Sequence, residues 1–232
     1  MPQQQAMTWQ SARRIVFRGP KLTDFLQGYL TCRTDRLSDG EWIATAICNV
    51  KGRVVVSGWA QMADEQEVSL LVHDSLAERT VAFLTPYARF ARCEISIDDE
   101  PVVIQQQDGG TIVGKWQVLE QQPAKGVADD LLAMDLALAA FAFISAPVSE
   151  QFLPQMINLP AHQAVDFDKG CYLGQEVVAR AQFRGAVKRT LSSTPWSESP
   201  PTIGEKWQDH GVVIWVANSK DNGASGIALT VS

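Results

Sequence analysis

The most informative stretch of this 232-residue chain surrounds a cysteine and reads Asp168-Lys169-Gly170-Cys171-Tyr172-Leu173-Gly174-Gln175-Glu176-Val177-Val178-Ala179-Arg180. Cys171 lies between two glycines, which permit unusual backbone angles and the close approach of a ligand. A helix-like segment follows, and the positive end of a helix, together with Lys169, favours a thiolate. The pattern predicts a reactive or ligand-binding thiol. The alternative is a small buried cysteine without reactivity, because free cysteine is among the most buried residue types.

Basic residues continue beyond this stretch, and no Asp or Glu lies between Glu176 and Glu198; the basic residues are Arg180, Arg184, Lys188 and Arg189. Such a cationic stripe could bind a polyglutamate tail, a phosphate or RNA. It is equally typical of a solvated helix face, or of ion pairs with acids elsewhere. Lys51-Gly52-Arg53 is open to the same two interpretations, because it is also typical of a hairpin turn with a left-handed glycine.

The N-terminal half combines helical and β-type hydrophobic patterns. Five side chains with i, i+3, i+4, i+7, i+8 spacing predict a helix that ends before Thr31: Leu22, Phe25, Leu26, Tyr29 and Leu30. β-rich runs at residues 42–48, 53–62 and 68–72 predict a meander. Trp42 and Trp59 in these runs could line a pocket for a flat ring, although core packing is their default role. Ser75-Leu76-Ala77-Glu78 has capping-box spacing and predicts a helix from there to about residue 87.

The C-terminal half is predicted to be mixed as well. We expect strands at residues 92–97, 102–106 and 111–119, a helix at 129–140, and two last strands at 212–217 and 226–231. Thr194-Pro195 and Ser199-Pro200-Pro201 predict a stiff connection before a separate small β unit. Strands and helices do not alternate regularly as in βαβ units, so the α+β class is favoured.

Composition excludes several functional classes. The formal net charge of −6 argues against a general electrostatic grip on nucleic acid. Four cysteines without a C-x-x-C pair argue against a disulfide framework or a zinc knuckle, and fit reduced thiols in the cytoplasm. The N-terminus has no secretory pattern, and the longest uncharged stretch, residues 136–149, is shorter than the ~18 residues of a membrane span. We therefore expect a cytoplasmic protein without a membrane segment.

Two catalytic patterns can also be rejected. Gly109 to Lys115 fits the start of a phosphate-binding loop, but Trp116 stands where a magnesium-binding Ser or Thr is required, and both flanks are β-rich. The three histidines, His73, His162 and His210, are not spaced as metal ligands, and no G-x-S-x-G elbow is present. No resident metal site is expected.

The signature around Cys171 also carries a family resemblance. Lys169-Gly170-Cys171-Tyr172-x-Gly174-Gln175-Glu176 resembles the signature of the folate-binding YgfZ family. Further agreement lies in Phe152-Leu153-Pro154-Gln155 with Asn158-Leu159, Val178-Ala179-Arg180, Phe183-Arg184-Gly185 and Lys188-Arg189. Two weaker blocks are Phe25-Leu26-Gln27-Gly28 with Thr31 and Asp35, and Cys48-Asn49-x-Lys51-Gly52-Arg53. The resemblance covers roughly residues 22–191.

The resemblance implies an α+β, aminomethyltransferase-like folate-binding fold, similar to that of the glycine cleavage system. Two α+β lobes would take up residues 1–190, and residues 191–232 would form a small C-terminal β-barrel. Members of the family support assembly or repair of iron–sulfur clusters in client enzymes, including a radical enzyme that methylthiolates tRNA. The functional thiol and lysine would be Cys171 and Lys169. The contacts to tetrahydrofolate would be Tyr172, Gln175, Glu176, Arg180, Lys51 and Gln27.

Two departures from the relatives bear on the chemistry. Val55 and Val56 stand where aminomethyltransferases carry an acidic pair, so aminomethyl transfer is not expected. Leu138 stands where relatives have a carboxylate that accepts the N–H donors of the pterin. An unpaired buried donor costs about 1–3 kcal/mol, so this replacement predicts pterin binding that is weaker by tenfold or more.

The leading hypothesis is therefore a non-catalytic, folate-site-bearing accessory protein for iron–sulfur enzymes. Cys171 could be a redox-sensitive thiol, a transient cluster ligand or a one-carbon acceptor, and the sequence leaves these three open. A cluster held by this chain alone is not expected, because such clusters usually take four thiolates. One alternative is a folate-dependent one-carbon transferase that uses Lys169, Glu176 or Cys171. The other is a tRNA-binding module, although the net charge argues against direct tRNA binding.

Overall fold

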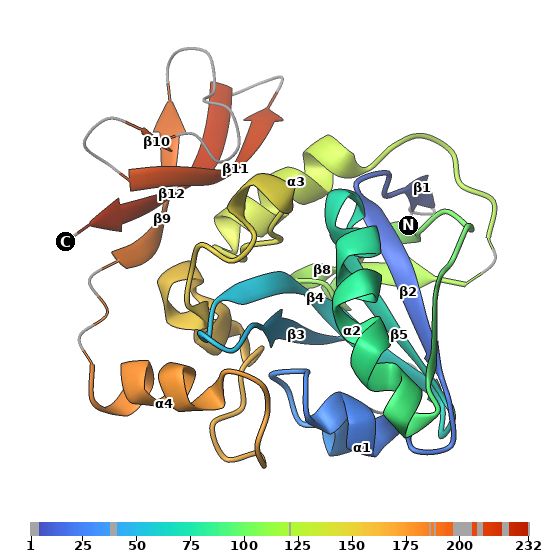
Figure 1. Cartoon of the computed structure of the whole chain (residues 1–232). Helices are drawn as coiled ribbons and strands as arrows, with labels where there is room; N and C mark the ends of the chain where they lie inside the picture. The colour runs from blue at the N-terminus through green and yellow to red at the C-terminus, as the bar shows by residue number, and fades with distance from the viewer. Residues whose placement is uncertain are drawn as a thin grey trace.

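The computed structural model describes residues 5–37, 41–120, 122–185, 187, 189–196, 206–207, 211–219 and 223–231. Three antiparallel sheets and four α-helices make up this part of the chain, as Figure 1 shows, so the predicted α+β class is confirmed. None of the described helices combines the length and the apolar character needed to span a membrane.

The largest sheet has the strand order β3 (Ile43–Cys48), β4 (Val54–Asp64), β5 (Glu67–His73), β2 (Ala12–Arg18) and β6 (Glu94–Ile97). The predicted meander is confirmed, because β3 pairs with β4 and β4 with β5 in antiparallel register. Seven consecutive residues of β4, from Val54 to Ala60, are buried, so both faces of this strand are covered. Helix α2 (Ala77–Ala91) packs against β2 and β6, and Figure 1 shows it in front of the sheet beside β2.

Helix α1 (Leu22–Gln27) buries the face that its spacing predicts, but it is shorter than expected. Leu22, Phe25 and Leu26 are buried, and so is Leu30 beyond the end of the helix. The helix ends early because Leu30 bridges to Ile47 of β3, which pulls the chain into the edge of the sheet.

The predicted capping box before α2 is wrong. Residues Asp74–Leu76 form a short 3-10 helix, η2, and α2 begins only at Ala77 without a side-chain cap. The Ser75 hydroxyl instead accepts a hydrogen bond from the Ala146 amide and is hydrogen-bonded to His73 Nδ1. It is therefore not available to cap the first turn of α2. The helix also continues past residue 87 to Ala91, with Pro86 in its interior.

A second sheet is formed by β1 (Met7–Thr8), β7 (Val103–Gly110) and β8 (Gly114–Leu119). Gly110 and Gly114 close the β7–β8 hairpin in the segment that resembles a phosphate-binding loop, which confirms that no such loop exists here. Buried Trp116 donates its indole N–H to Asp135 Oδ2 at 2.9 Å and so joins β8 to helix α3 (Asp129–Leu138).

The third sheet has the order β10 (Lys206–Trp207), β11 (Gly211–Ser219), β12 (Gly223–Val231) and β9 (Arg189–Trp196). Figure 1 shows α3 between β11 and the rest of the molecule. The predicted stiff connection at Thr194-Pro195 is wrong, because both residues lie in β9; this strand pairs only with β12, and an edge strand tolerates a proline. Residues 199–201 lie outside the described residues.

The expected C-terminal β-barrel is not seen in the described strands. The end strands β10 and β9 are not paired with each other, so these four strands form an open sheet. The domain division at residues 190 and 191 stays a prediction.

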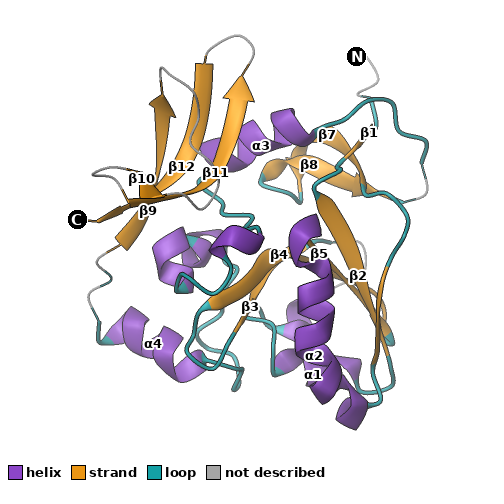
Figure 2. Cartoon of the chain, turned by 45° about the horizontal axis from the view of Figure 1, so that its top comes forward, coloured by secondary structure: helices purple, strands orange, loops and turns teal. Residues whose placement is uncertain are grey.

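Between α3 and α4 (Gln175–Phe183) the chain is mostly irregular and leads to the signature segment, as Figure 2 shows. Its only regular elements among the described residues are the 3-10 helices η3 (Ala146–Val148), η4 (Pro154–Ile157) and η5 (Leu159–His162). This path carries Phe141, Phe152 and Ile157 into the core. This path places the signature segment beside the loop after α1, to which it is hydrogen-bonded.

Candidate functional site

Lys169 is the most strongly held residue of the signature. Its side chain is buried, and its Nζ donates to the carbonyl oxygens of Gln27 and Cys32 at 2.9 Å each, and also to that of Leu30. The ammonium lies 5.1 Å from the centre of the Tyr172 ring, within cation–π range. Burial lowers the pKa of Lys169 to about 8, against smaller opposing effects of Cys32, Asp166 and Asp35.

Hydrogen bonds on both sides of Lys169 join the same two segments. The Thr31 hydroxyl donates to the Ala164 carbonyl at 2.5 Å, and the Asp166 amide donates to the Thr31 carbonyl at 2.9 Å. The Leu173 amide donates to the Gly28 carbonyl at 2.9 Å. Residues 164–173 are therefore bonded along their length to residues 27–32, and we call this set of bonds the seam.

Cys171 lies within the seam and is exposed. All four cysteines are among the described residues, and the other three, Cys32, Cys48 and Cys93, are buried. The expectation that Cys171 lies at a helix N-terminus is wrong, because α4 begins at Gln175 with Gly174 as its N-cap. The field of a helix falls off within its first turn, so α4 does not explain a reactive Cys171.

Tyr172 contributes a buried hydroxyl without a partner. The residue is 5% exposed, and its hydroxyl finds no hydrogen-bond partner among the described residues. Burial raises the pKa of this phenol, and Cys48 and Asp166 act in the same direction. A buried donor without an acceptor costs about 1–3 kcal/mol, so a ligand or a water that accepts from Tyr172 would be stabilised here.

Gly174 allows the start of α4 to touch the β3–β4 turn. Its φ is +82°, and a Cβ at this position would run into the Asn49 carbonyl oxygen and lie 2.9 Å from Gly52 Cα. Gly52 has a φ of +68° and is itself packed against Val177. Gly174 is therefore required by conformation and by space, and Gly52 by conformation, whereas the sequence indicated only general backbone freedom.

This contact brings Lys51 to the start of α4. Lys51 is exposed and lines an open depression of about 600 Å³ with Asn49, Val50, Arg53, Glu150 and Gln151. Glu150 is already bound to Asn49 Nδ2 at 2.9 Å and to Arg79 at 2.5 Å. Lys51 and Arg53 are thus the cations of this depression that could meet an anionic ligand.

The remaining predicted folate contacts fall into two groups. Gln27 and Gln175 lie at the seam: Gln27 Oε1 accepts from the Thr34 amide at 3.2 Å, and Gln175 Nε2 donates to the Lys169 carbonyl at 3.4 Å. Glu176 and Arg180 are exposed on α4. Arg184 is exposed too, whereas Lys188 and the side chain of Arg189 lie outside the described residues, so a shared basic face stays a prediction.

An aromatic pocket of about 260 Å³ lies elsewhere and is lined by Ala44, Trp59, Thr111, Val113, Gly114, Ala139, Phe141 and His162. The rings of Trp59 and Phe141 stack with centres 4.4 Å apart, and His162 meets Phe141 edge-on at 5.1 Å. The Thr111 hydroxyl is buried and has no partner within the part of the chain that is described. Sequence reasoning found only Trp59 here, because the other residues come from β3, the β7–β8 hairpin and the irregular path after α3.

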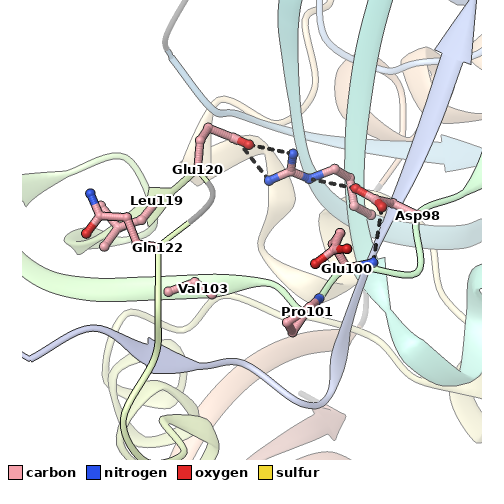
Figure 3. A pocket seen from close by; sticks show the side chains of 8 residues that line it. Asp98, Glu100, Pro101, Val103, Leu119, Glu120 and Gln122 are labelled. Atoms are coloured by element: carbon pink, nitrogen blue, oxygen red, sulfur yellow. Dashed lines mark hydrogen bonds and ion pairs between the residues drawn. The ribbon is translucent and has the colours of Figure 1, made fainter.

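A larger pocket of about 460 Å³, shown in Figure 3, is lined by Arg14, Asp98, Glu100, Pro101, Val103, Leu119, Glu120 and Gln122. The Arg14 guanidinium donates to both carboxylate oxygens of Glu120, at 2.8 and 2.9 Å, and lies 4.0 Å from Asp98. The cation of this pocket is therefore already paired, and none of the predicted site residues lies in it.

Comparison with known proteins shows what this chain is similar to. No family model matches the chain. A protein of Escherichia coli O157:H7 named "tRNA-modifying protein YgfZ" is 28% identical over 253 residues, which cover 85% of this chain and 76% of that protein. A protein of Cronobacter sakazakii with the same name is 26% identical over 252 residues, covering 84% of this chain and 75% of that protein. The chain is a homologue of the YgfZ proteins.

A solved structure agrees with the fold of this YgfZ homologue. The glycine cleavage system aminomethyltransferase T from Bartonella henselae matches 97% of this chain and 78% of that chain, with a TM-score of 0.71 and 14% identity. The resemblance inferred from the Cys171 signature and the aminomethyltransferase-like fold are both confirmed.

The residues that line the aromatic pocket can be compared with the groups that the pterin ring of tetrahydrofolate requires. Trp59 and Phe141 stack on each other and are each 1% exposed, so their faces are not open to a flat ring, and the Thr111 hydroxyl, unpartnered among the described residues, is the polar group left in the pocket. None of the eight described residues that line the pocket is acidic. Leu138, which directly precedes the lining residue Ala139, is 66% exposed. The pocket therefore supplies neither an open aromatic face nor a carboxylate for the N–H donors of a pterin.

Proposed function

We propose that this chain is an accessory protein for iron–sulfur enzymes and that Cys171 is the thiol that meets the client. The observation that carries the proposal is the exposure of Cys171 on a firmly bonded segment, while Cys32, Cys48 and Cys93 are buried. The names of the relatives, which refer to tRNA modification, support a client that acts on tRNA.

Of the three roles open to Cys171, we propose that of a transient cluster ligand. Iron–sulfur clusters usually take four thiolates, and Cys171 offers one. No group of three or more His, Cys, Asp or Glu suited to a metal ion occurs in the described part of the chain. The client, or a small thiol, would supply the other ligands, and the cluster would stay cargo rather than a resident group.

The test is complementation in a bacterial strain that lacks its own YgfZ protein. The level of methylthiolated nucleosides in tRNA, measured by mass spectrometry, reports on a cluster-dependent radical enzyme. Wild-type chain and Cys93→Ser should restore this level, whereas Cys171→Ser should not. Full restoration by Cys171→Ser would contradict the proposal, and Cys93→Ser controls for the loss of a buried thiol.

We further propose that the chain binds tetrahydrofolate, which carries one-carbon units, only weakly, because the aromatic pocket offers neither an open ring face nor a carboxylate. The buried Thr111 hydroxyl, which has no partner among the described residues, is the group that would hydrogen-bond to a ligand in this pocket. Without a carboxylate, affinity should be at least tenfold below that of a relative that has one. Anaerobic calorimetry should give saturable binding that Thr111→Val weakens about fivefold or more; equal binding by Thr111→Val would contradict this use of the pocket.

The transferase alternative has less support. Val55 and Val56 are fully buried and apolar, and none of the described residues that line the aromatic pocket is acidic. A carboxylate able to assist transfer at a folate nitrogen is therefore missing from that pocket. Steady turnover of an aminomethyl or methyl donor by the purified chain would favour the transferase instead.

A further inference from the structure

The Lys169 ammonium is placed to bind backbone carbonyls rather than to act as an acid or base in a reaction. An ammonium group has three N–H donors, and those of Lys169 point to three carbonyl oxygens, of Gln27, Leu30 and Cys32. A lysine that acts as a general acid or base needs an N–H or a lone pair free for the reacting group. Lys169 has its donors engaged with the backbone of the neighbouring segment.

The three carbonyls form an acceptor site whose members are all satisfied by the N–H donors of one Lys169 side chain. The Gln27 carbonyl belongs to the last turn of α1, where carbonyls lack helical donors and the helix end is negative. The carbonyls of Leu30 and Cys32 belong to nearly fully buried residues in the loop that follows. If the ammonium were removed, three acceptors would lose a charged donor together, and each such loss is costly.

We infer that Lys169 is a positioning residue, whose ammonium fixes residues 164–173 to the end of α1 and thereby sets where the Cys171 thiol is presented. The inference rests on the proposed function only in taking Cys171 as the thiol that meets the client. Lys169 and Cys171 are two residues apart, and the seam bonds at Asp166 and Leu173 flank both. Loss of the ammonium should loosen this short segment as a unit.

Other charged and titratable groups face Lys169 from each side. Cys32 and Asp35 come from the segment after α1, Asp166 from the seam, and the Tyr172 ring from the signature itself. Asp35 is already paired with Arg33, so it does not replace a carbonyl as the main partner of the ammonium. The backbone carbonyls remain the groups in direct hydrogen-bond contact.

The experiment measures hydrogen exchange and thiol labelling on the purified full chain without any client. In Lys169→Met, the amides of Asp166 and Leu173 should exchange about tenfold faster or more, while those of the β4–β5 ladder stay unchanged. Cys32 should become open to iodoacetamide, because its backbone borders the site of the lost ammonium. The matched control Lys125→Met removes an exposed lysine and should leave all three readouts as in wild type.

The conservative variant separates charge from mere size. Lys169→Arg keeps a cationic donor and should recover part of the protection of both amides. Unchanged protection in Lys169→Met, or a Lys169→Arg chain as unprotected as Lys169→Met, would overturn the inference.

If Lys169→Met does not fold, a measurement on the wild-type chain tests the inference instead. In wild type, an amine reagent should modify Lys169 at least tenfold more slowly than exposed Lys125, and Cys32 should be labelled mainly in molecules whose Lys169 is modified. Equal rates at the two lysines would refute the inference. Since no client is involved, these readouts stand apart from complementation: Cys171→Ser could fail or succeed there without altering the seam.

Discussion

The Tyr172 hydroxyl is a donor enclosed by protein without an acceptor among the described groups. Removing such a group relieves its desolvation cost, so Tyr172→Phe should raise the free energy of unfolding of the ligand-free chain by about 1 kcal/mol. Urea unfolding measures this change, and Tyr87→Phe, at an exposed tyrosine, serves as the control that should change little. A loss of stability in Tyr172→Phe would mean that the hydroxyl has a partner in the folded chain.

Lys169 makes a second residue-scale prediction, about pH. Its pKa is about 8 in the folded chain and near the ordinary 10.5 when unfolded, so the unfolded chain binds more protons between these values. Stability rises with pH wherever the unfolded state binds more protons. The free energy of unfolding should therefore gain a contribution from Lys169 between pH 8 and pH 10.5, and none below pH 8.

The check is the difference between wild type and Lys169→Met, measured by urea unfolding from pH 7 to pH 10.5. The difference isolates Lys169, because the other titratable groups are the same in both proteins. It should be constant below pH 8 and then shift in favour of wild type. A shift in the opposite direction would show that the three carbonyls outweigh burial and hold the pKa of Lys169 above its ordinary value.

At the scale of elements, the contact between the β3–β4 turn and α4 depends on Gly174. Gly174→Ala adds strain at a φ of +82° and a clash with the backbone at Asn49, so we expect a loss of about 3 kcal/mol or more. Gly109→Ala is a matched control, since its φ is +76° but a Cβ there meets nothing within 4 Å. It should cost only about 1 kcal/mol. Equal losses in thermal or urea unfolding would show that the close contact with the turn contributes nothing.

Elements with a strong local pattern could be predicted from the sequence. The β3–β4–β5 meander and the buried face of α1 follow from hydrophobic spacing, which depends only on neighbouring residues. The capping box failed because the Ser75 hydroxyl is bound by Ala146, far along the chain. Pro195 was misjudged because the sequence does not reveal which strand lies at an edge.

The candidate site was predicted in part, for the same reason. The signature identified Lys169, Cys171 and Tyr172 as neighbours, and the structure brings Gln27 to them through the seam. The roles differ from local expectation: Lys169 binds carbonyls of residues 27–32 rather than standing free beside the thiol. Only long-range contacts decide this, so no local pattern could have shown it.

At the scale of the whole molecule, the described chain keeps its thiol segment and its aromatic pocket on separate sets of residues. None of the pocket-lining residues belongs to the seam, and none of the predicted folate contacts lines the pocket. The fold is similar to that of an aminomethyltransferase, and the family resemblance predicts carboxylates where this chain has Val55, Val56 and Leu138. This combination favours a protein that presents a thiol to a partner over one that turns over a folate.

The most direct measurement is anaerobic cluster reconstitution of a purified apo iron–sulfur client from the same cell, with and without this chain. The rate of recovery of cluster absorbance or client activity should rise when wild-type chain or Cys93→Ser is added. Cys171→Ser should leave the rate at the level of the client alone. If Cys171→Ser accelerates recovery as well as wild type does, the claim that Cys171 is the working thiol of this protein is wrong.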